Sequence, residues 1–167
     1  MAAVTTLPAA FTVGQVLTST QMNDLRGAFR VLQVVQGTTS TSTSNSTNTY
    51  ADTTLTVSIT PSATSSKILV MVMQNGLTKN AGNAGNSIDL ILLRGATAIN
   101  TIAVAALYNN TNERVYGDTL ATVYLDSPAT VASTTYKTQF RNNTNAASVG
   151  VQENAATSTI TLMEISA

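Results

Sequence analysis

The stretch formed by residues 55–74, LTVSITPSATSSKILVMVMQ, decides the fold of this chain. In its first part, Leu55, Val57 and Ile59 alternate with polar residues, a period of two that is typical of a strand with one face towards solvent. The segment that follows, 61–66, has turn composition and begins with a proline, which cannot donate to a ladder. The chain then continues as ILVMVM over 68–73. These features predict two strands joined by a turn, the second of them apolar on both faces.

That second apolar face needs a cover, because a strand in an antiparallel sheet usually has only one dry face. Segment 88–93 is also apolar on both faces, with Asp89 as the exception. Within the chain, segment 99–107 and a short N-terminal helix look too small to cover two strands, so we expect a second copy of the chain to do so, in a homotrimer. Periodicity does not say which face is the interface: the candidates are Leu69, Met71 and Met73, or the opposite set Ile68, Val70 and Val72.

Composition narrows the possible functions. The 167 residues are enough for one core, and only 10% are charged, against ~25% in typical soluble domains. The formal net charge is zero, so we expect no nucleic-acid partner. The chain has no Cys and no His, which removes the usual zinc ligands, and we expect no metal and no cofactor. No signal peptide and no apolar run of ~20 residues is visible, so we expect no membrane insertion.

The remaining chain reads as short strands separated by polar turns. Residues 134–141 alternate, with Tyr136, Thr138 and Phe140 predicted to point inwards. Loops are predicted at 37–48, 74–87 and 109–117, and segment 99–107 is ambiguous between strand and helix. Eight or nine short strands predict an all-β fold, an antiparallel β-sandwich that is jelly-roll-like, over residues 31–167.

Residues 1–30 are predicted to form a separate N-terminal arm with a short helix. Thr18 and Gln21 fit a capping box, and Leu17 and Met22 fit the accompanying hydrophobic staple, which predicts a helix over about 19–28. A helix this short must dock on something, either its own β-domain or a neighbouring protein. The docking candidates are Phe11, Val16, Leu17, Met22, Leu25 and Phe29.

Segment 11–23, FTVGQVLTSTQMN, resembles the N-terminal segment of many tail and fibre proteins of tailed bacteriophages. Four later segments are similar to landmarks of small virion-surface β-domains of such phages: TPSATSSKILV at 60–70, LLRG at 92–95, LDSPAT at 125–130 and TITLMEI at 159–165. The resemblance implies a protein that is made in the host cytoplasm and located in the virion. It also implies that the arm attaches to other virion proteins and that the β-domain trimerises.

No pair of carboxylates has a spacing that suggests glycan cleavage, and Asp52 and Asp126, beside turns, are expected to be solvated. We therefore predict no enzyme activity and no catalytic residue. A polar loop is the candidate for binding a host-surface glycan or protein. The competing interpretation, which the sequence favours, is a loop whose tyrosines only anchor strand ends. Its members are Tyr108, Asn109, Asn110, Asn112, Glu113, Arg114 and Tyr116.

Three functions follow as hypotheses. The first is a phage virion structural protein, a short tail fibre or tail-tip protein that presents loops for host-surface binding. The alternative is a capsid decoration or head-fibre protein. The third, from another class, is a glycan-degrading spike, which the acidic residues do not favour.

Overall fold

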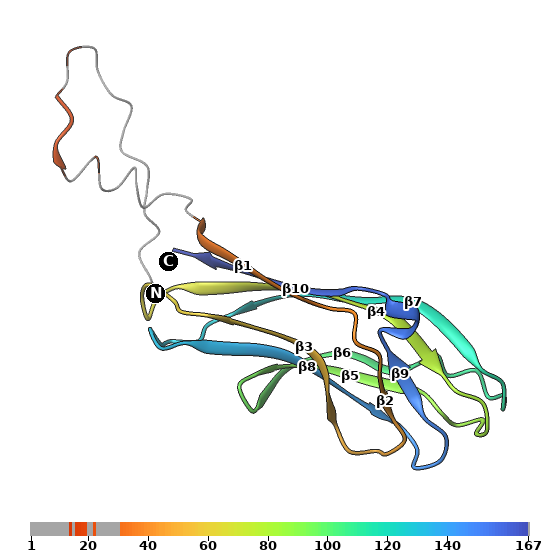
Figure 1. The fold of residues 1–167 in the computed structure, drawn as a ribbon. Coiled ribbons are helices and arrows are strands. Elements are labelled where there is room, and N and C mark those ends of the chain that lie inside the picture. Colours follow the sequence, from red (N-terminus) through yellow and green to blue (C-terminus); the bar gives the residue numbers. More distant parts are fainter. Residues whose placement is uncertain (1–13, 15, 20–21, 23–30, 167) are drawn as a thin grey trace.

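The protein is an antiparallel β-sandwich, as the sequence predicts (Figure 1). The computed structural model describes residues 14, 16–19, 22 and 31–166. Most of the predicted N-terminal helix lies outside these residues, although Ser19 and Met22 are helical and the Met22 amide donates to the Thr18 carbonyl at 3.0 Å. In the first sheet the strands are β1 (Val31–Thr39), β2 (Thr43–Asn45), β4 (Lys67–Lys79), β7 (Val115–Asp126), β9 (Val149–Val151) and β10 (Ser158–Ile165). In the second sheet they are β3 (Ala51–Ile59), β5 (Ile88–Arg94), β6 (Thr97–Ala106) and β8 (Thr134–Asn142).

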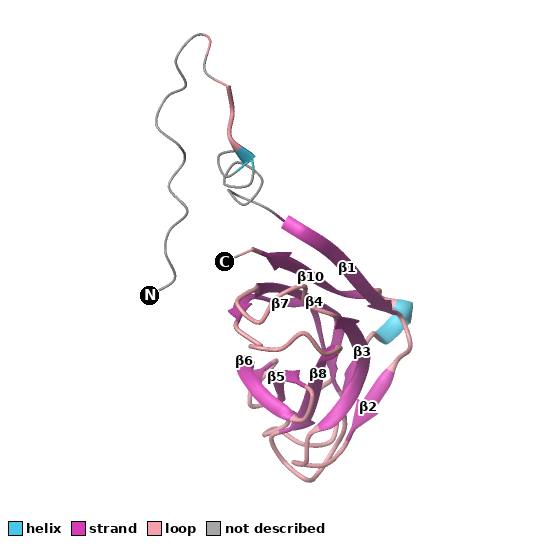
Figure 2. Cartoon of the chain, turned by 90° about the vertical axis from the view of Figure 1, so that its left-hand side faces the viewer, coloured by secondary structure: helices cyan, strands magenta, loops and turns pink. Residues whose placement is uncertain are grey.

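Strand β4 is the centre of the first sheet. It pairs with β7 along one edge, and with β10 and then β9 along the other. The second sheet has the order β3-β8-β5-β6, and the chain passes repeatedly from one sheet to the other, so neighbouring strands are distant in sequence. A single 3₁₀ turn, η1 (Glu153–Ala155), links β9 to β10 within the described chain. Figure 2 shows the two layers edge-on, with η1 at the side of the sandwich.

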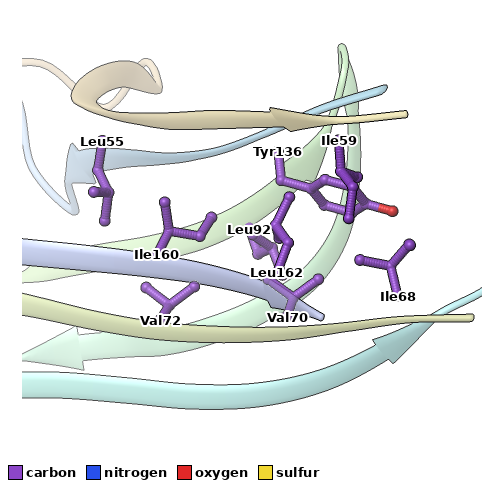
Figure 3. Close-up of a cluster of buried hydrophobic side chains, with 9 residues drawn as sticks. All are labelled: Leu55, Ile59, Ile68, Val70, Val72, Leu92, Tyr136, Ile160 and Leu162. Atoms are coloured by element: carbon purple, nitrogen blue, oxygen red, sulfur yellow. The ribbon is translucent and has the colours of Figure 1, made fainter. Parts of the chain in front are cut away.

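The core lies between the layers and confirms the alternation in residues 55–59. Leu55 and Ile59 are buried, whereas the residues between them face outwards or are half-buried. On β4, the even-numbered set points into the core, so the odd-numbered set lies on the outer face of the first sheet. Burial of each such side chain contributes about 1.5–3 kcal/mol. Figure 3 shows this cluster: Leu55, Ile59, Ile68, Val70, Val72, Leu92, Tyr136, Ile160 and Leu162.

A polar seam separates this cluster from a second apolar cluster nearer the other end of the sandwich. Gln74 of β4 and Thr138 of β8 are fully buried, and the Thr138 hydroxyl donates to Gln74 Oε1 at 3.0 Å. Gln74 Nε2 donates in turn to the Ser158 hydroxyl at 3.1 Å. The seam therefore joins the two sheets by hydrogen bonds. Beyond it lies the second cluster, formed by Leu77, Ile88, Leu90, Phe140, Val149 and Val151.

The outer face of β5 is covered from within the chain, contrary to the expectation that a second copy is needed there. Ile91 and Leu93 are only 8% and 4% exposed. Their partners across the β5–β8 ladder are Gln139 and Lys137, whose long aliphatic stems lie beside them. The prediction considered only whole elements as covers and did not include the stems of polar side chains on the neighbouring strand.

Several element boundaries also differ from the prediction. Strand β1 continues to Thr39 and β2 occupies part of the predicted 37–48 loop. Gly37 allows this continuation, because any side chain there would collide with the Thr56 carbonyl and Val57 of β3. Strand β4 extends to Lys79, so the predicted 74–87 loop begins only at residue 80. The ambiguous segment 99–107 is mostly strand β6, and β7 begins at Val115, inside the predicted 109–117 loop.

Candidate functional site

The sandwich has two different ends. At one end, Val31 of β1 pairs with Ile165, which also pairs with Lys67 at the start of β4. From there β4 runs to Lys79, which is about 40 Å away at roughly 3.3 Å per residue. The loops 80–87, 107–114 and 143–148 gather at that far end and are called the distal loops here (Figure 1). The chain thus enters the sandwich at one end, and its two longest loops, 80–87 and 107–114, lie at the other.

A fully buried lysine holds two of the distal loops together. Lys79 Nζ donates to the Thr111 carbonyl at 2.7 Å, to the Ala84 carbonyl at 3.3 Å and to Asn109 Oδ1. An ammonium group has three donors, and all three are used here. Because Ala84 and Thr111 lie in different loops, the lysine fixes the two loops relative to each other. The sequence analysis treated Lys79 as a loop residue, and no signal in the sequence singled it out.

Buried asparagines attach the third distal loop to the first. Asn142 Nδ2 donates to Asn86 Oδ1 at 2.8 Å and to the Ala147 carbonyl. The Thr144 hydroxyl donates to the same Asn86 oxygen at 2.9 Å, and Asn86 Nδ2 donates to the Ser148 carbonyl at 3.4 Å. Asn86 and Asn142 are fully buried. The distal loops are therefore a hydrogen-bonded unit held by internal polar contacts.

The residues proposed for receptor binding separate into three groups. Asn109 binds Lys79 and the Asn112 carbonyl accepts from the Gly82 amide at 3.0 Å, so these two support the loops. The Arg114 guanidinium lies over the Tyr116 ring, 4.7 Å from its centroid, and pairs with Glu153 of η1 at 3.6 Å. The remaining candidates are Tyr108, Asn110 and Glu113, which are exposed like the other four.

A surface hollow of about 530 Å³ lies where β4 and β7 meet η1. Tyr116, on β7, is one of its walls and is 59% exposed. Sequence reasoning grouped Tyr116 with the loop and missed the hollow, because the other walls come from distant segments. They include Met73, Asn75, Asp118, Thr119, Glu153 and Asn154.

The outer face of the first sheet carries a second candidate surface, which we call the apolar face. Strand register places Met163, Leu69 and Leu125 in one row across β10, β4 and β7. Met71 and Val123 form the next row, and Val123 is 66% exposed. The apolar face consists of Val34, Leu69, Met71, Met73, Val123, Leu125 and Met163.

The proposed docking residues of the arm fall partly outside the described residues. Phe11, Leu25 and Phe29 are among those that the structure does not describe. Val16, Leu17 and Met22 are described and exposed. Their role in docking stays a prediction.

The carboxylates have mainly structural partners. The expectation that Asp126 is solvated is wrong: it is buried and accepts from Arg94 and from the Tyr136 hydroxyl at 2.6 Å. Burial and the Asp126 carboxylate together raise the pKa of Tyr136. Asp52 is exposed, and its hydrogen bond from Lys137 holds the pKa of its carboxyl below the ordinary value. Among the described residues, no three His, Cys, Asp or Glu side chains lie close enough to hold a metal ion.

Comparisons with family models and with curated proteins assign no function to these sites. No family model matches the chain, and no curated protein matches it. In the part of the chain that the structure describes, no helix is long and apolar enough to cross a membrane.

Proposed function

We propose that this protein is a structural component of a tailed-phage virion, a short tail fibre or tail-tip protein. The observation that carries the proposal is the two-ended arrangement of the domain. The phage-like segment 11–23 precedes β1, which starts at one end of the sandwich, and the distal loops lie about 40 Å away at the other. A protein that is attached through its N-terminal segment and presents loops outwards needs this separation.

The apolar face supports self-association as the second element of the proposal. Its odd-numbered β4 residues are the interface candidates Leu69, Met71 and Met73, and neighbouring strands extend the patch on both sides. Contiguous exposed apolar patches mark interaction surfaces. Three copies meeting around an axis would cover this face as far as Met73, which lies at its edge opposite Ala121 and Thr159 and also lines the hollow. The low charge of the chain reduces the cost of desolvation.

We propose a binding role and no catalysis. Asp89 and Asp126, which are buried, form ion pairs with Arg141 and Arg94, each at 2.9 Å. Glu164 is also buried and accepts hydrogen bonds from Gln33 and Ser62. These acidic residues therefore stabilise the fold. The glycan-degrading spike remains the third hypothesis, and an assay for sugar release from host envelope tests it.

Attachment through the arm is tested in the full-length chain. Met22→Asp combined with Leu25→Asp should leave a folded protein that no longer incorporates into particles, because a charged docking face is costly to bury. Val104→Asp is the matched control, since Val104 is 70% exposed on β6 of the other sheet. Normal incorporation of the double variant would contradict the proposal.

The alternative is a capsid decoration or head-fibre protein, which would use the same arm. Labelling the protein in intact virions separates the two hypotheses. Signal at the tail is the expected result, and signal distributed over the head would favour the alternative.

A further inference from the structure

We propose that the hollow between β4, β7 and η1 binds a single pyranose unit of a neutral glycan. This inference rests on the proposed function, because it names the ligand class that the host-facing part of the domain would take. The volume of about 530 Å³ lies within the ~300–1,000 Å³ typical of small-molecule sites. The ligand class follows from what the walls offer: one aromatic ring and several short polar side chains.

Tyr116 provides the ring. Arg114, which does not line the hollow, covers the ring with its guanidinium 4.7 Å from the centroid. Arg114 also pairs with Glu153, which lines the hollow, so the guanidinium links the ring to η1. A rigid ring with an open apolar surface suits the C–H face of a pyranose, and its phenolic hydroxyl adds a polar end.

Two polar side chains of the hollow have no side-chain hydrogen bond or ion pair within the described residues, and a third is held in place by hydrogen bonds. Neither Asp118 nor Asn154 makes a side-chain hydrogen bond or ion pair with any described residue, and both are exposed. Asn75 is oriented by two hydrogen bonds at 2.6 Å, one from the Thr119 hydroxyl and one to the Thr157 carbonyl. A carboxylate accepts from two adjacent hydroxyls, and an amide both donates and accepts. This set matches the hydroxyls of a sugar ring.

The charges argue against a cationic ligand. Arg114 neutralises Glu153, which leaves Asp118 as the single unpaired carboxylate of the hollow. One exposed carboxylate attracts a cation only weakly in water. A neutral ligand with several hydroxyls can form hydrogen bonds with more of the polar side chains that line the hollow than an ammonium group can.

The backbone around the hollow is strained in a way that shapes it. Gln152, Asn154 and Ala155 all have φ between 54° and 58°, a left-handed conformation that is unfavourable for residues with a side chain. Gly76 allows η1 to approach β4 this closely, since a Cβ there would lie 2.7 Å from both Ala156 Cβ and the Glu153 amide nitrogen. Strain of this kind, about 1–3 kcal/mol per residue, concentrates at binding sites.

The test is a titration of the isotope-labelled full-length protein with methyl glucopyranoside, methyl galactopyranoside and methyl mannopyranoside, followed by NMR. At least one pyranoside should shift the amides of Asn75, Asp118 and Asn154 with a millimolar Kd. Tyr116→Ala should weaken that binding at least tenfold, whereas Tyr116→Phe should retain most of it. Tyr108→Ala is the matched control, because Tyr108 is 54% exposed but does not line the hollow.

Two results would overturn the inference. They are the absence of localised shifts with all three pyranosides, and equal shifts with the acyclic polyol sorbitol. A negative titration with normal incorporation into virions would reject the sugar site alone. Loss of incorporation in the arm variant is a separate measurement, so the two proposals fail independently.

Discussion

Arg94 of β5 and Asp126 of β7 join the two sheets: Arg94 Nη1 lies 2.9 Å from each carboxylate oxygen of Asp126. The buried Tyr136 hydroxyl donates to the same carboxylate at 2.6 Å. The contact therefore ties together three strands from both layers, near the end of the sandwich where β1 begins.

Arg94→Met should destabilise the protein by about 1–3 kcal/mol, because it leaves the buried Asp126 carboxylate without its cation. The measurement is the midpoint of urea unfolding. Lys137→Met is the control, since Lys137 pairs at 2.8 Å with the exposed Asp52, and an exposed pair contributes less than about 1 kcal/mol. If the two variants lower the urea midpoint equally, the contact between Arg94 and Asp126 does not stabilise the packing of the two sheets.

The fold class could be predicted because the sequence alternates with period two in β3 and β8. Leu55, Ile59 and Phe140 are buried where the alternation places them. Asp126 could not be predicted, because its neighbours Ser127 and Pro128 have turn composition, while its partners Arg94 and Tyr136 are brought to it by strand pairing across the sandwich. The composition around Asp126 predicts a turn. It carries no information on Arg94 and Tyr136, which come from the other sheet.

Acidification should remove a contribution of Glu164 to stability. Burial opposes its ionisation, but hydrogen bonds from Gln33, Ser66 and Ser62 outweigh this and hold the pKa of its carboxyl below the ordinary value. A lowered pKa in the folded state gives stability that is complete above the unfolded pKa of ~4.3 and is lost as the pH falls through the folded pKa.

The change that tests this is Glu164→Gln. The variant should be less stable than the wild type at neutral pH, and the difference should shrink as the pH falls below ~4.3 towards the folded pKa. Urea unfolding at a series of pH values measures it. Glu113→Gln makes the same chemical change at an exposed loop residue and serves as the control. If the difference in stability between Glu164→Gln and the wild type stays constant with pH, ionisation of Glu164 does not cause the loss of stability in acid.

Lys79→Met should destabilise the protein by about 2–4 kcal/mol and increase hydrogen exchange in the distal loops. The variant keeps the aliphatic volume but leaves the Thr111 and Ala84 carbonyls without the ammonium that they accept from. Lys67→Met is the control, because Lys67 Nζ makes one exposed hydrogen bond, to the Ser127 hydroxyl. Unchanged exchange in residues 80–87 and 107–114 would show that the loops are held by other contacts.

The candidate site illustrates a different limit of sequence reasoning. Tyr116 was singled out from the sequence, but its environment was not, because Asn75, Asp118 and Asn154 belong to three separate segments. Only the pairing of β4 with β7 and the close approach of η1 at Gly76 bring them together. Such a site depends on long-range strand register, for which the sequence contains no local pattern.

Self-association through the apolar face is the last prediction. Val123→Lys combined with Leu125→Lys should convert a homotrimer into monomers, since both residues are exposed on β7 and two charges would have to be buried at the interface. Sedimentation velocity at micromolar and nanomolar concentration measures the mass. Val104→Lys is the control, because it places a lysine on an exposed apolar residue of the opposite sheet. The wild type and the control should share one mass. A wild-type monomer at both concentrations would mean that the apolar face of the first sheet stays uncovered by copies of this chain, and a trimer that survives both lysines would place the interface elsewhere.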